Sequence, residues 1–158
     1  MIRQLAIAAA VMGLAACQPA AAPAEPAAEP AAAEPVEIST IYDWNWRAHG
    51  GSADLDFGDG DWAEGVSLFQ LSCLPGSGRV EASWGADQPA RLSSGGSTLD
   101  LTVQEAGASA GDPVFKALRA SGELTVTQAN SAKTLVGKAA GKKAVEEFFA
   151  YCTTPPAG

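Results

Sequence analysis

Four aspartates in one short segment are the residues whose spacing most directly suggests chemistry. Asp54, Asp56, Asp59 and Asp61 offer hard oxygen ligands of the kind that calcium prefers. Their spacing does not fit an EF-hand loop, because Gly58 stands where an acidic or Asn ligand belongs. We therefore predict a solvated acidic hairpin without metal or cofactor, with Asp54 and Asp56 on the outward face of a half-buried strand. A calcium site is the alternative.

An aromatic stripe lies shortly before the aspartates. Tyr42, Trp44 and Trp46 recur at every second residue, which places them on one face of a strand. Flat aromatic rings stack against sugar rings, so this face is a candidate ligand platform. Aromatic residues at this period more often belong to a core, because each Trp buries about 150–250 Å². We expect the core, and an exposed platform stays open as the alternative.

Signatures of catalysis are weak in this sequence. It has no His-Glu-x-x-His motif. Paired carboxylates hydrolyse sugars only when one of them lies in apolar surroundings, and Glu81, between Val80 and Ala82, is the nearest case. The sequence predicts a non-enzymatic binding or structural domain of unknown ligand, with a cell-wall-acting hydrolase as an alternative.

The N-terminus has the pattern of an export signal. Arg3 precedes an apolar stretch, residues 5–14, that is too short to span a bilayer. The stretch ends in Leu14-Ala15-Ala16-Cys17, which resembles the lipobox of bacterial lipoproteins. The resemblance implies that residues 1–16 are a signal peptide and that Cys17 is acylated, with palmitate among such groups. Gln18, rather than Asp, follows the cysteine, which in enterobacterial sorting favours the outer membrane.

Two cysteines remain once Cys17 is assigned to lipid. Cys73 and Cys152 form an even pair in a compartment that oxidises thiols, so we predict a disulfide between them. The alternative is a nucleophilic thiol at Cys73 with His49, the only histidine, as its base. The apolar sequence around Cys73 does not provide the electropositive setting that a reactive thiol needs.

Composition divides the rest of the chain into a tether and a domain. Residues 17–37 comprise the lipidated cysteine and a tract of Ala, Pro and Glu that cannot form a core and favours extended states. Residues 38–158 are long enough for a single globular domain with its own core.

Alternating apolar residues predict that this domain is mainly β, an antiparallel sandwich or barrel-like α+β fold. Strands are expected at 41–48, 53–57, 66–73, 79–84, 90–93, 97–104 and 123–128, with 134–136 pairing with the last of them. Asp112-Pro113 begins a short helix that Gly122 ends, and a second short helix is expected at 142–151.

Two further resemblances are limited in extent. The tail from Asp112 to Val126, followed by Leu135-Val136-Gly137 and a helix, is similar in layout to the ends of invasion-associated locus B-type envelope proteins. Small β lipoproteins with one disulfide also include the c-type lysozyme inhibitors, whose loop carries Ser-Gly-x-x-Tyr. Here Ser94-Gly95 is present but Thr98 stands in place of the Tyr. Neither resemblance implies a site residue, and a lysozyme-inhibitor-like protein is a further alternative function.

Net charge restricts the partners. The chain has 18 Asp and Glu against 10 Lys and Arg, and a phosphate backbone demands the opposite balance, so we exclude nucleic acid. The expected partners are a membrane, through the lipid anchor, and an envelope protein or a cell-wall polysaccharide. The expected location is the cell envelope, at the outer membrane and facing the periplasm or the surface.

Overall fold

The computed structural model describes residues 34–35, 40–84, 88–102, 106–129 and 131–155. The predicted signal peptide, Cys17 and most of the predicted tether lie outside these residues. Within them the chain forms ten strands and two helices. In order, these are β1 (Glu34–Pro35), β2 (Asp43–His49), β3 (Ser52–Gly58), β4 (Ser67–Cys73), β5 (Arg79–Ser83), β6 (Ala90–Ser94), β7 (Ser97–Leu101), β8 (Gly107–Ser109), α1 (Pro113–Ser121), β9 (Glu123–Gln128), β10 (Ser131–Val136) and α2 (Ala139–Thr153).

The strands form two five-stranded sheets. One has the order β1-β10-β9-β6-β7 and the other the order β2-β3-β4-β5-β8. Every pairing is antiparallel except that of β1 with β10. Together with the two helices, this confirms the predicted mainly β, α+β class.

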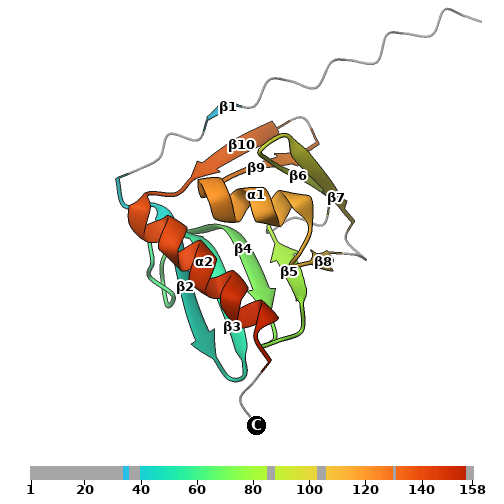
Figure 1. The fold of residues 1–158 in the computed structure, drawn as a ribbon. Coiled ribbons are helices and arrows are strands. Elements are labelled where there is room, and N and C mark those ends of the chain that lie inside the picture. Colours follow the sequence, from blue (N-terminus) through green and yellow to red (C-terminus); the bar gives the residue numbers. More distant parts are fainter. Residues whose placement is uncertain (1–33, 36–39, 85–87, 103–105, 130, 156–158) are drawn as a thin grey trace, which may run out of the picture.

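The two helices lie against the sheets and against each other (Figure 1). Helix α1 packs on β6, β7 and β9, and α2 packs on β2, β3 and β5. The predicted apolar stripe of α2 is fully buried in the shared core, and its members are Val145, Phe148, Phe149 and Cys152. The last helix is therefore fixed to the sheet that carries the aspartates.

Local sequence explains the turns and the first helix. Gly50-Gly51 and Gly95-Gly96 have positive φ angles and close two-residue hairpin loops, which need that conformation at both positions. The Asp112 carboxylate accepts a hydrogen bond from the backbone N–H of Val114, with Pro113 as the first helical residue. Gly122 ends α1 in the left-handed conformation, as predicted.

Helix α2 begins earlier than the sequence predicts because its N-terminus is capped from another element. Lys138, the capping residue, makes no side-chain cap bond. Instead the Asp43 carboxylate, on β2, accepts hydrogen bonds from the backbone N–H groups of Lys138 at 2.9 Å and Gly141 at 3.1 Å. The close approach requires a glycine at 141, since a Cβ there would lie 1.9 Å from the Asp43 carboxylate.

Two strands were not predicted. Glu34–Pro35, in the segment predicted as a disordered tether, pairs with β10 as strand β1. Its partner is an otherwise open edge strand, which offers unpaired backbone groups to an extended segment. Strand β8 has three small residues without alternation and pairs with β5.

Candidate functional site

The outer face of the β2-β3-β4-β5 sheet carries a row of polar side chains. Strand register aligns Arg47 with Asp54, Asp54 with Ser72, and Ser72 with Glu81. Because side chains alternate along a strand, the next residues point to the core, and these are Leu55, Leu71 and Ala82. The alternating sequence thus builds a polar face across four strands.

Asp54 lies in the middle of this row. The His49 Nε2 atom lies 2.6 Å from its carboxylate oxygen, and the Arg47 guanidinium lies 3.9 Å from the same oxygen. The prediction that Asp54 is solvated is wrong, since only 8% of the residue is exposed. The reason is that β3 is a central strand, and the longer side chains of β2 cover the short aspartate.

Asp56 is also buried, with 7% exposed, which again corrects the predicted solvated position. The Ser67 hydroxyl donates a hydrogen bond to its carboxylate. Burial raises the pKa of Asp56 above its usual 3.8, and the Ser67 hydrogen bond opposes this shift. Asp56 is therefore the carboxylate on this face whose charge is costly to the fold.

Asp59 and Asp61 stabilise the loop between β3 and β4 instead of converging on a cation. The Asp59 carboxylate accepts hydrogen bonds from the backbone N–H groups of Val66 and Asp61, which lower its pKa. Asp61 accepts from the N–H groups of Ala63 and Glu64. Among the residues that the structure describes, no group of three or more His, Cys, Asp or Glu could hold a metal ion. The four aspartates therefore do not come together as the calcium alternative requires.

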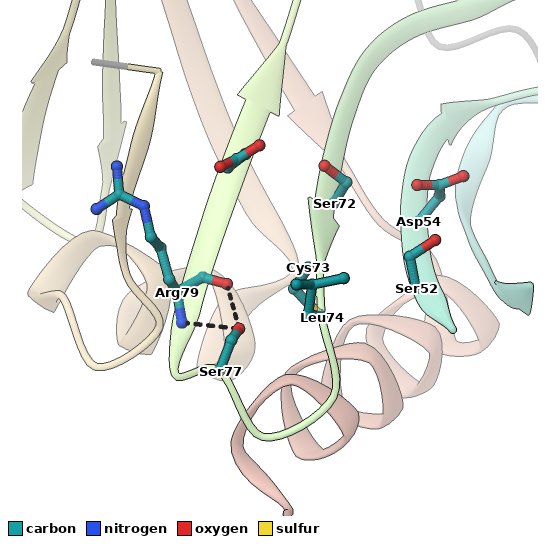
Figure 2. A pocket seen from close by; sticks show the side chains of 8 residues that line it. Ser52, Asp54, Ser72, Cys73, Leu74, Ser77 and Arg79 are labelled. Carbon is teal, nitrogen blue, oxygen red and sulfur yellow. Dashed lines mark hydrogen bonds between the residues drawn. The ribbon is translucent and has the colours of Figure 1, made fainter. Parts of the chain in front are cut away.

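A groove of about 420 Å³ opens beside Asp54 on the same face. Figure 2 shows side chains from β3, β4 and the start of β5 around it. It is lined by the polar residues Asp54, Glu81, Arg79, Ser52, Ser72 and Ser77, together with Cys73 and the exposed Leu74. The Ser77 hydroxyl donates to the Arg79 backbone carbonyl and accepts from its N–H, which holds the turn before β5.

The predicted disulfide is confirmed and lies at one end of the groove. Cys73 at the end of β4 is bonded to Cys152 on α2, with an S–S distance of 2.01 Å. The alternative of a nucleophilic thiol at Cys73 with His49 as base is wrong, because the sulfur is already bonded and His49 contacts Asp54. The groove wall is thus covalently joined to the last helix.

The aromatic stripe belongs to the core more than to a surface. Trp44 is 2% exposed, packs edge-on against Phe57 and Phe69, and donates its indole N–H to the Gly122 carbonyl. A ligand platform at Trp44 is therefore wrong, because no ring face is free.

The other two members of the stripe are half-buried. Trp46 packs beside Tyr151 and donates its indole N–H to the Glu147 carboxylate at 2.8 Å, and that bond lowers the pKa of Glu147. Tyr42 packs against the same core. Helix α2 thus occupies the face on which a sugar would have stacked.

The polar row and the groove were not predicted from the sequence. A signal for part of it was present, because a two-residue turn at Gly50-Gly51 fixes Arg47 opposite Asp54. The alignment with Ser72 and Glu81 depends on the β3–β4 and β4–β5 registers, which their longer connections leave open.

Comparison of the chain with protein-family models, with curated proteins and with solved structures finds no match. In the part of the chain that the structure describes, no helix is both long and apolar enough to cross a membrane.

Proposed function

We propose that this chain is a lipid-anchored protein of the bacterial cell envelope whose domain binds a ligand without transforming it. The anchor rests on Leu14-Ala15-Ala16-Cys17, which resembles a lipobox. The envelope location is supported by the bond between Cys73 and Cys152, since structural disulfides persist in oxidising compartments. Gln18 after the cysteine favours the outer membrane.

The groove on the outer face of the β2-β3-β4-β5 sheet is the observation that carries the binding proposal. Its carboxylates accept hydrogen bonds, and its serine hydroxyls both donate and accept them. The Arg47 guanidinium, 3.9 Å from Asp54, offsets the negative charge of that carboxylate. Carboxylates and hydroxyls together suit an uncharged, hydroxyl-rich polymer, so we assign cell-wall polysaccharide as the ligand class.

The anchor is tested in cells with labelled palmitate. The wild-type protein incorporates the label and fractionates with the outer membrane, whereas Cys17→Ala loses both properties because no thiol is left to acylate. As a control, Cys73→Ala/Cys152→Ala keeps the label, since those sulfurs are bonded to each other. Equal membrane retention of Cys17→Ala and wild type would refute the anchor.

The groove is tested by co-sedimentation of the purified mature protein with insoluble cell-wall sacculi. Glu81→Gln removes one charged acceptor and weakens retention about tenfold, since a hydrogen bond to a charged group is worth roughly 1.5–3 kcal/mol. Glu146→Gln, an equal charge change on the exposed side of α2, leaves retention unchanged. The ligand assignment is contradicted if the two variants are retained equally on sacculi, or if the wild-type protein is not retained. Release of soluble sugar from the sacculi would contradict non-catalytic binding.

A further inference from the structure

A second, smaller cavity lies at the other end of β4, where the two sheets meet. It has a volume of about 80 Å³, and its walls come from β4, β9, β10 and the residue after β5. Leu68 lines this cavity and Cys73 lines the groove, and the two residues lie five positions apart on β4, a distance of about 16 Å. The two sites are therefore distinct, and a ligand in this cavity would not touch the groove.

The inner walls of the cavity are apolar. Val126 and Leu135 are buried members of the core, and Leu68 and Trp84 pack against that core. The Trp84 indole N–H is already donated to the Gln88 carbonyl at 3.0 Å, so the ring contributes carbon surface to the cavity. A methyl or methylene group would be favourably buried here.

The polar side of the cavity is a set of hydrogen-bond donors. Gln128 and Ser131 face each other in register across β9 and β10, and Lys133 follows on the same face of β10. The Gln128 side-chain nitrogen is buried and has no hydrogen-bond partner among the described residues. An unpaired buried amide costs about 1–3 kcal/mol, and a hydrogen-bond acceptor bound at this position would remove that cost. The Ser131 hydroxyl and the Lys133 ammonium group are exposed and lie at the mouth.

We propose that this cavity binds a short monocarboxylate. An amide N–H, an ammonium group and a hydroxyl supply donors for the two carboxylate oxygens, and the apolar walls receive the carbon chain. The small volume of about 80 Å³ limits the ligand to a short chain, such as a carboxylate of two or three carbons. An acetamide-like ligand has the same shape as acetate but lacks its charge, and so gains less from Lys133.

The test is an NMR titration of the ¹⁵N-labelled mature protein with sodium acetate, propionate and lactate. The Gln128 side-chain amide and Trp84 indole signals shift with millimolar dissociation constants, as expected for a ligand of roughly four to six heavy atoms. Gln128→Leu, which keeps the side-chain size, weakens binding about tenfold or more through loss of a charge-assisted hydrogen bond. Lys133→Gln weakens it severalfold, whereas Lys116→Gln, an equal charge change on α1, leaves it unchanged.

Three outcomes overturn the proposal. If neither signal moves at about 50 mM carboxylate, far above the expected millimolar constants, the cavity holds water only. If acetamide binds as tightly as acetate, the site recognises a neutral amide. If Gln128→Leu and Thr127→Val, whose side chains lie on opposite faces of β9, weaken binding equally, the effect is structural rather than a contact with the ligand.

Discussion

Removal of the disulfide tests the assembly of the groove most sharply. Cys73 and Cys152 are separated by 79 residues, so the bond closes a long loop in the unfolded chain. In the chain-entropy model, a loop of this length stabilises the fold by about 4.5 kcal/mol. Domains of this size have total stabilities of roughly 5–15 kcal/mol. The double variant Cys73→Ala/Cys152→Ala is therefore expected to lose about 30% or more of its stability, and unfolded protein becomes detectable at 37 °C if the starting value is low.

The assay is urea unfolding of the mature protein followed by tryptophan fluorescence. The dependence of unfolding free energy on urea should also steepen in the double variant, because its unfolded state is no longer cross-linked and exposes more surface. Wild-type protein reduced with dithiothreitol is the matched control and should follow the double variant. A loss below about 1 kcal/mol in both the variant and the reduced protein would refute the entropic reasoning, since neither retains the cross-link.

Three further predictions concern single side chains. Asp43→Ala should destabilise the fold by about 1–2 kcal/mol in urea unfolding, as loss of an N-cap does, because the N–H groups at the start of α2 lose their acceptor; no loss would show that water replaces it. Because burial raises the pKa of Asp56, the folded state binds its proton more readily than the unfolded chain, and its charge destabilises the fold above that pKa. Asp56→Asn should therefore be more stable than wild type at pH 7, by a margin that shrinks as the pH falls through the raised pKa, and a margin independent of pH would contradict this. Trp46→Phe removes the N–H that holds the Glu147 pKa low, so that pKa should rise towards 4.5 in a carboxyl NMR titration, and an unchanged pKa would assign the shift to another group.

Most of the fold could be predicted because its signals are local. Alternation of apolar residues gives the strands, paired glycines give two hairpins, and Asp112-Pro113 with Gly122 bounds the first helix. The disulfide followed from counting cysteines, and its position followed from the apolar stripe of α2. Each of these inferences requires only residues that are neighbours in sequence or a single pairing rule.

The features that were not predicted depend on contacts between residues far apart in the chain. Helix α2 begins at Ala139 because Asp43, almost a hundred residues earlier, caps it. Strands β1 and β8 have no hydrophobic pattern and exist because neighbouring edges offer backbone groups. Periodicity reports which face a residue occupies, but it does not report what covers that face.

The aspartates illustrate that difference, and it bears on function. Alternation correctly places Asp54 and Asp56 away from the core, but an outward position means solvation only on an edge strand or beneath short neighbours. On a central strand, the outer face is lined by side chains from both sides, so a short carboxylate there is shielded and must find a partner. Asp54 finds His49 and Arg47, and Asp56 finds Ser67. Glu81, on β5, stays exposed at the groove because its neighbours across the sheet, Ser72 and Gly107, are short, so its carboxylate can meet a ligand.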